Sequence, residues 1–165
     1  MLHKMMQKAD SRLGFPAASA HCDIPCKIYD PGPALIAALT VVRMTDLMAE
    51  HMDKKDDSAG WFNTMARYVR EKEDQATLCK EEVRIIWGDY IKGPQIEKFP
   101  DVHSVAHSVM LAASKAKQEA DRSHAVHLVD QVNAFAEIFW KTKDVKVKRA
   151  VCPYPPALEV VYPDL

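Results

Sequence analysis

The fold is decided by residues 58–91, which read SAGWFNTMARYVREKEDQATLCKEEVRIIWGDYI. Apolar side chains recur in this stretch at alternating steps of three and four residues, the spacing of one face of an α-helix. Only Lys72 interrupts the apolar pattern. The stretch therefore predicts one long helix with a continuous seam, formed by Phe62, Met65, Val69, Lys72, Ala76, Cys79, Val83, Ile86 and Tyr90.

Three further helices are expected around this one. The first covers about residues 34–54, and Gly93-Pro94 ends the long second helix. The third starts after Pro100, and the fourth follows a turn at residues 121–123, where Ser123 can serve as the N-cap. Short connections between long helices are typical of an antiparallel bundle. We therefore predict an all-α, antiparallel four-helix bundle over residues 34–143, preceded by an irregular N-terminal segment.

Composition excludes several classes of protein. The 165 residues are 48% hydrophobic and 27% charged, and the formal net charge is −1. A dedicated nucleic-acid binder needs a basic face, so we expect no nucleic-acid partner. No apolar run is long enough to suggest a bilayer crossing, so we expect no membrane partner. The glycine-rich loops that cradle phosphates are absent from the sequence.

The two ends of the chain differ from its middle. Residues 1–20 carry three basic side chains, lack a long apolar stretch and end in Ala18-Ser19-Ala20, small residues that a peptidase could cut. We interpret them as a leader removed inside the cell, which implies a leader peptidase and a cytoplasmic protein. Residues 144–165 are rich in proline and predict an extended tail, with Cys152 as an idle exposed thiol.

The chemistry is concentrated in residues 21–33, which read HCDIPCKIYDPGP. Two thiols four residues apart can be idle, and the spacing lacks the second half of a zinc pattern. Cleavage after Ala20 would free the amine of His21, and this amine, the Cys22 amide and thiolate, and the Cys26 thiolate can then form a planar set of two nitrogens and two sulfurs. Such a set suits nickel(II) or copper(II), with the His21 imidazole as a fifth ligand.

Residues 21–31 resemble the metal-binding hook of nickel superoxide dismutases, and the resemblance extends to residue 143. Arg67 lies 46 residues after the hook histidine, as it does in that family. Three further segments are similar to family segments: residues 87–90 (WGDY), 97–100 (EKFP) and 138–143 (IFWKTK). The resemblance implies a homohexamer of four-helix bundles that uses a nickel ion, alternating between Ni(II) and Ni(III), to convert superoxide to dioxygen and hydrogen peroxide.

The resemblance also implies roles for individual residues. His21, Cys22 and Cys26 would be the metal ligands. Tyr29 would be the catalytic tyrosine that orders water and limits access to small anions, although it could also be a packing aromatic.

Three further residues would support the ligands. Asp23 would hold the hook amides, and Pro25 would fix the return of the hook through a cis bond. Arg67 would orient the imidazole, although it could also be a solvated helix charge.

Two positions depart from the family pattern. Lys27 stands where the family commonly has glycine, and a lysine in a left-handed conformation costs about 1 kcal/mol. We hypothesise that Lys27 instead steers superoxide toward the hook. Ala37 stands where known members carry a glutamate that binds the hook imidazole, which puts the axial bond in doubt but leaves the planar set intact.

Other interpretations remain open. The pairs His103/His107 and His124/His127 could share a metal, but we interpret them as solvated helix flanks because no carboxylate ligand pattern accompanies them. A nickel- or copper-binding hook protein with little or no dismutase activity is the alternative function. A third possibility is an interaction protein that uses the basic residues 141–149, although such a run is more often a solvated end.

Overall fold

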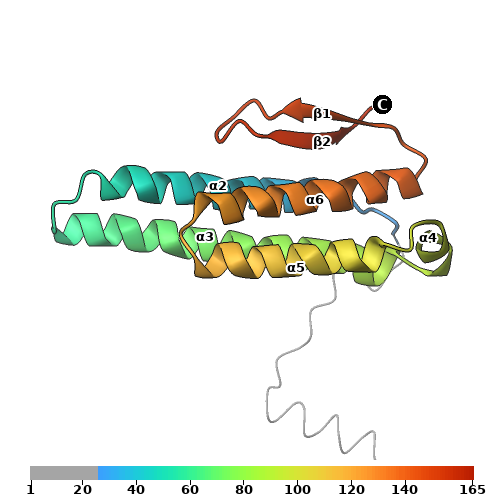
Figure 1. Ribbon diagram of the computed structural model, residues 1–165, viewed down its shortest axis with the longest axis horizontal. Helices are drawn as coiled ribbons and strands as arrows, with labels where there is room; N and C mark the ends of the chain where they lie inside the picture. Colours follow the sequence, from blue (N-terminus) through green and yellow to red (C-terminus); the bar gives the residue numbers. More distant parts are fainter. Residues whose placement is uncertain (1–25) are drawn as a thin grey trace, which may run out of the picture.

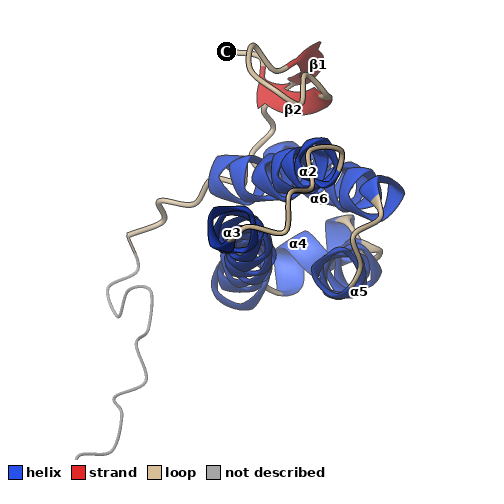
Figure 2. Cartoon of the chain, turned by 90° about the vertical axis from the view of Figure 1, so that its left-hand side faces the viewer, coloured by secondary structure: helices blue, strands red, loops and turns tan. Residues whose placement is uncertain are grey.

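The computed structural model describes residues 26–165, and four long helices dominate it (Figure 1). Both α2 and α5 pack against α3 and α6, so the order of the helices around the bundle follows their order in the chain (Figure 2). Consecutive long helices run in opposite directions (Figure 1). The predicted all-α, antiparallel four-helix bundle is therefore confirmed, with long helices α2 (Gly32–Met52), α3 (Ala59–Ile85), α5 (Val102–Gln118) and α6 (Arg122–Thr142).

The predicted seam of α3 is confirmed in its second half and wrong at its start. Ala76, Cys79 and Val83 are completely buried, whereas the Phe62 side chain is 55% exposed. The neighbouring Trp61 is buried instead. Its ring stacks on His51 of α2, with the ring centres 4.9 Å apart, and its Nε1 donates to the His51 carbonyl at 3.1 Å. These contacts with the end of α2 orient the first turn of α3 so that Trp61 faces the bundle and Phe62 faces solvent.

α2 begins two residues earlier than predicted, because two features of the sequence favour a helix start there. The Asp30 carboxylate accepts a hydrogen bond of 2.7 Å from the Gly32 amide. Pro33 lies in the first turn, where a residue without an N–H is tolerated. The expectation that residues 21–33 contain no regular helix is therefore wrong at its last two positions.

α2 is also, among the described helices, the one long and apolar enough to cross a bilayer by length and composition. This is weak support for a membrane segment, because the core helix of a bundle passes the same test. Here the apolar face of α2 packs against α3 and α6, with Ala34, Ala38, Val41 and Val42 completely buried.

The predicted end of the long second helix near residue 91 is confirmed, but its last turn is a wider helix. Ile86–Tyr90 form a π-helical turn, η1, in which the Ile91 amide donates to the Ile86 carbonyl at 3.1 Å. A short helix that was not predicted, α4 (Gly93–Lys98), then leads to α5. The π-turn shifts the register of the helix just where Trp87 and Tyr90 project, and such turns are frequent at functional sites.

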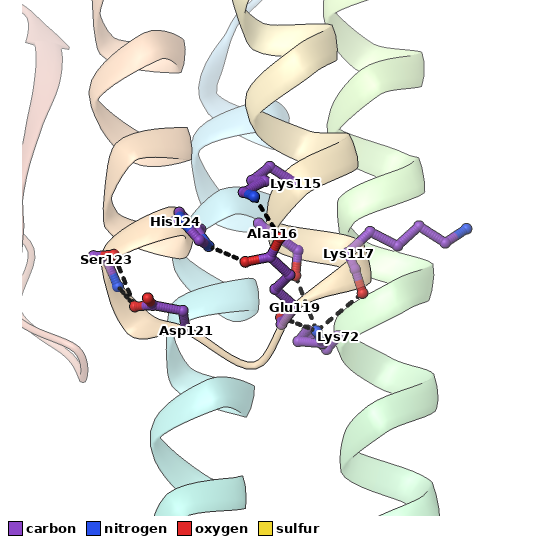
Figure 3. A network of polar contacts seen from close by, with 8 residues as sticks. All are labelled: Lys72, Lys115, Ala116, Lys117, Glu119, Asp121, Ser123 and His124. Atoms are coloured by element: carbon purple, nitrogen blue, oxygen red, sulfur yellow. Dashed lines mark hydrogen bonds and ion pairs between the residues drawn. The ribbon is translucent and has the colours of Figure 1, made fainter.

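The turn between α5 and α6 is tied to α3 by the residue that interrupts the seam. The Lys72 side chain is buried, and its Nζ donates to the carbonyls of Ala116, Lys117 and Glu119 at 2.9, 3.0 and 2.6 Å (Figure 3). Burial lowers the pKa of Lys72. The three carbonyls lie at the C-terminal end of α5, where a cation is favourable and where carbonyls lack partners within the helix. Lys72 therefore satisfies the end of a neighbouring helix.

The start of α6 corrects one prediction. Asp121, and not Ser123, is the N-cap, because its carboxylate accepts from the Ser123 amide at 2.8 Å and from the Ser123 hydroxyl at 2.7 Å (Figure 3). On the same turn, the Glu119 carboxylate contacts Lys115 and lies 3.0 Å from Nδ1 of His124. The hydrogen bond from Lys115 holds the pKa of Glu119 below its usual value.

The C-terminal tail is a β-hairpin, β1 (Val147–Val151) and β2 (Glu159–Pro163), which packs on α6. The two strands pair antiparallel, with Val147 opposite Pro163. Asn133 of α6 attaches the hairpin: its side chain donates to the Glu159 carbonyl at 3.0 Å and accepts from the Val161 amide at 2.9 Å.

The hairpin also changes the environment of Cys152. The expectation of an exposed Cys152 is wrong, because Cys152, the residue after β1, is 2% exposed and belongs to the buried apolar cluster. The last residue, Leu165, is fully exposed.

Candidate metal centre

The structure describes the second half of the predicted hook. Cys26, Lys27 and Tyr29 lie in the segment that leads into α2, whereas His21, Cys22, Asp23 and Pro25 lie outside the described residues. The Cys26 thiol is exposed and forms no disulfide, whereas Cys79 and Cys152 are buried. Among the described thiols, Cys26 is thus the one accessible to a metal ion. This placement fits the predicted donor set, in which Cys26 supplies the second thiolate.

Lys27 adopts the conformation for which glycine is the usual residue. Its φ is 61°, in the left-handed region, and its side chain is exposed. The structure therefore shows the positive φ on which the expected cost of a lysine depends. A left-handed non-glycine residue costs about 1 kcal/mol. Strain of this kind is concentrated at functional sites, where the surrounding structure holds it.

Tyr29 packs against the π-turn at the end of α3. Its ring centre lies 5.5 Å from that of Tyr90, and the Tyr90 ring lies 5.2 Å from Phe139 of α6. The Thr142 hydroxyl donates to the Phe139 carbonyl at 2.6 Å, so the Tyr90 hydroxyl, 2.7 Å from Thr142 Oγ1, is the donor in that contact. Tyr29 thus rests on an aromatic group whose position is fixed by two helices.

Arg67 lies elsewhere in the bundle. It lines a surface depression with Met44 and Tyr68, and its side chain is exposed. Tyr29 contacts the turn that follows Ile85, which lies 18 residues after Arg67 on α3, or about 27 Å along the helix. The structure therefore does not bring Arg67 together with Tyr29. The hook histidine that Arg67 is expected to orient lies outside the described residues, so this role stays a prediction.

The other departure from the family pattern, Ala37, belongs to the core. It is 1% exposed and packs within the main apolar cluster of α2 and its neighbours. A glutamate at this position would have to bury a carboxylate, which is costly without a partner. The alanine is therefore well suited to the packing of this chain.

The histidine pairs do not form a metal site with the geometry shown. Trp87 Nε1 donates to His103 Nδ1 at 2.8 Å, so the Nδ1 lone pair is already occupied. The ring proton then lies on Nε2, and neither nitrogen has a free lone pair for a metal. His107 is exposed, and His124 faces Glu119. Within residues 26–165, no group of three or more His, Cys, Asp or Glu side chains is placed to hold a metal ion. This arrangement supports the interpretation of these histidines as helix flanks.

Sequence reasoning did not identify Phe139, Thr142 and Lys143 as neighbours of Tyr90, the ring against which Tyr29 packs. Lys143 Nζ lies 4.7 Å from the centre of the Tyr90 ring and 5.2 Å from that of Phe139. The signal was present in residues 138–143, the segment that resembles the end of the family's chain. This segment lies next to Tyr90 because the end of α6 packs against the π-turn, a tertiary contact that the sequence does not reveal.

Comparison with known proteins agrees with this arrangement. The family model for nickel-containing superoxide dismutase matches residues 16–143. Superoxide dismutase [Ni] of Streptomyces coelicolor is 37% identical over 135 residues, which span 81% of this chain and 97% of that protein. The corresponding protein of Streptomyces seoulensis is 35% identical with the same coverage.

Solved structures give the same result. A native nickel superoxide dismutase superposes with a TM-score of 0.65 and 34% identity, covering 74% of this chain and 99% of that one. Its apo form superposes with a TM-score of 0.63 and 32% identity, covering 71% and 98%. The family match ends at Lys143, before the hairpin begins. The chain belongs to the nickel-containing superoxide dismutase family, and it is an enzyme with a nickel cofactor.

Proposed function

We propose that this chain dismutes superoxide at a nickel ion held by His21, Cys22 and Cys26 after residues 1–20 have been removed. In the reaction, one superoxide ion is oxidised to dioxygen, and a second, with two protons, is reduced to hydrogen peroxide. A nickel ion bound to thiolate and amide donors supplies the one-electron chemistry. The observation that carries the proposal is the family match across hook and bundle, together with the exposed, unpaired Cys26 thiol at the start of the bundle.

The described residues have separate parts in this proposal. Cys26 supplies a thiolate. Tyr29, supported by Tyr90, limits the approach to small anions and orders water beside the site. Lys27 contributes positive charge, which attracts an anionic substrate. Asp23 and Pro25 shape the part of the hook outside the described residues. Arg67 orients the His21 imidazole in this proposal, although within one chain its position on α3 is distant from Tyr29.

The decisive experiment compares the mature chain, residues 21–165, with the full precursor. Both are reconstituted with nickel, analysed for bound metal and assayed for loss of superoxide. We expect stoichiometric nickel and rapid dismutation in the mature chain, and neither in the precursor, because its His21 nitrogen is an amide. Zinc or no metal in the mature chain, or full activity in the precursor, would contradict the proposal. Nickel binding without dismutation would favour the alternative, a hook protein that only binds nickel or copper.

We also propose that the natural protein is cytoplasmic, is processed there by a leader peptidase and assembles as a homohexamer. The lack of a secretory apolar stretch in residues 1–20 supports the location. Large apolar side chains on the surface support assembly, among them Ile36, 57% exposed, and Leu111, 59% exposed. N-terminal sequencing of the natural protein tests the processing, and light scattering of the mature chain tests the assembly.

A further inference from the structure

Lys143 carries an ammonium group that is held in place at the Tyr29 end of the bundle. It follows the last residue of α6 and caps that helix. Its Nζ lies 4.7 Å from the centre of the Tyr90 ring and 5.2 Å from that of Phe139. Both distances are within the range of cation–π attraction. The side chain is therefore directed toward the aromatic group that supports Tyr29.

Within residues 26–165, no carboxylate forms an ion pair with Lys143. The adjacent Asp144 is paired with Lys98 Nζ at 2.9 Å. The C-terminal end of α6 carries partial negative charge, which stabilises the ammonium where it lies. Lys143 therefore presents positive charge at this end of the molecule.

The ammonium is close enough to Tyr29 to act on an anion there. Tyr29 and Lys143 contact the same ring, with Tyr29 5.5 Å and Nζ 4.7 Å from the centre of Tyr90, so Nζ lies no more than about 10 Å from the Tyr29 ring. The screening length at physiological ionic strength is about 8 Å. At low ionic strength the electrostatic potential of this charge therefore extends to Tyr29, and added salt weakens that potential.

We propose that Lys143 is a fixed positive charge that draws small anions, superoxide among them, to the Tyr29 side of the metal centre. The inference rests on the proposed function for the identity of the anion. Lys143 is a positioning residue, because its proposed role is exerted through its charge and not through contact with the reacting atoms. Coulomb attraction over this distance predicts an effect of about two- to fourfold on the rate of encounter at low salt.

The test uses three variants of the nickel-loaded mature chain. Lys143→Met removes the charge, Lys143→Arg keeps a cation over the rings, and Lys141→Met is the matched control. Lys141 is exposed, carries the same charge and precedes Lys143 by two residues. The second-order rate constant with superoxide is measured by pulse radiolysis at about 0.01 M and about 0.15 M salt.

We expect Lys143→Met to lower the rate constant about two- to fourfold at the lower salt concentration and to flatten its salt dependence. Lys143→Arg should retain both, and Lys141→Met should lose distinctly less. An unchanged rate and salt dependence in Lys143→Met, or an equal loss in Lys141→Met, would overturn the inference.

A second measurement does not require nickel or activity. Azide, a small anion, is titrated into the metal-free mature chain while the backbone amide signals of Tyr29 and Tyr90 are followed by NMR. We expect salt-sensitive shifts in the wild type and in Lys143→Arg, and their loss in Lys143→Met. Shifts that persist in Lys143→Met would overturn the inference. Since this readout is independent of dismutation, an inactive wild type would refute the proposed function and leave the role of Lys143 testable.

Discussion

Lys72 and Lys143 place ammonium groups at opposite ends of α6, about 30 Å apart along the 21-residue helix. Lys72 is buried, and three carbonyls accept its hydrogen bonds. Lys143 lies over two rings and has no ion pair within the described chain. The same functional group thus closes a helix end in one region and offers charge to the surroundings in the other. The comparison separates a region that maintains the fold from a region suited to chemistry.

The largest effect is expected at the hook, where the comparison predicts a loss of function without a loss of fold. Cys26→Ser removes one thiolate from the proposed donor set and should abolish stoichiometric nickel binding and dismutation in the mature chain. Cys26 is exposed, so the unfolding midpoint of the metal-free protein in urea should not change. Elemental analysis and circular dichroism report the two properties. Retained nickel, or a lower unfolding midpoint of the metal-free variant, would contradict the separation between a region for chemistry and a region that maintains the fold.

The next effect is expected at the opposite end, with the reverse pattern. Lys72→Met keeps an unbranched side chain up to the Cε position but leaves three carbonyls of the α5 end without their donor. The free energy of unfolding should fall by about 3 kcal/mol, whereas the folded fraction should keep its activity per nickel.

A charge-matched control is available on the same helix. Arg70→Met removes an exposed cation from α3 and should cost much less. Urea titrations of both variants provide the measurement, and an equal cost would show that Lys72 acts through its charge alone.

A smaller effect concerns the buried thiol on the α3 seam. Burial raises the pKa of Cys79 from its ordinary value of 9.0 to about 12. The unfolded chain loses this proton above about pH 9 while the folded chain keeps it, so stability falls as the pH rises through this range. Between pH 7.5 and 10, the wild type should lose about 1 kcal/mol more than Cys79→Val. Identical pH dependence of the two urea midpoints would show that the thiol does not titrate differently on folding.

The smallest effect is expected at the left-handed residue of the hook. Lys27→Gly relieves the conformation at φ 61°, and the free energy of unfolding should rise by about 0.5 kcal/mol after the entropy of glycine is counted. The same substitution removes a charge that we propose to steer superoxide. A Lys27→Glu variant that reacts as fast as the wild type at low salt would refute that steering role.

The sequence predicted the bundle well because the helix period is a local property. It failed where tertiary contacts decide. Trp61 replaced Phe62 in the core because of its contacts with His51, and Lys72 proved to be a cap whose partners lie 44 to 47 residues away. The hairpin was not predicted, because it depends on non-local contacts. Its two strands pair with each other, and Asn133 of α6 anchors them.

The site was predictable to a different extent. The hook was identified from its motif. The sequence left open whether the position of Lys27 needs a positive φ, and the structure shows that it has one. Arg67 was assigned from its spacing to the hook histidine, which lies outside the described residues, so its role stays a prediction. Lys143 was noted as part of a basic run, but its place over Tyr90 depends on where α6 ends.

The anchored hairpin has a practical consequence for handling the protein. Leu165 is fully exposed and follows a strand held to α6, so an affinity tag or fluorophore fused there would project into solvent. The opposite terminus does not offer this freedom, because the proposed chemistry needs an unblocked amine on His21. Purification handles for the mature enzyme therefore belong at the carboxyl end.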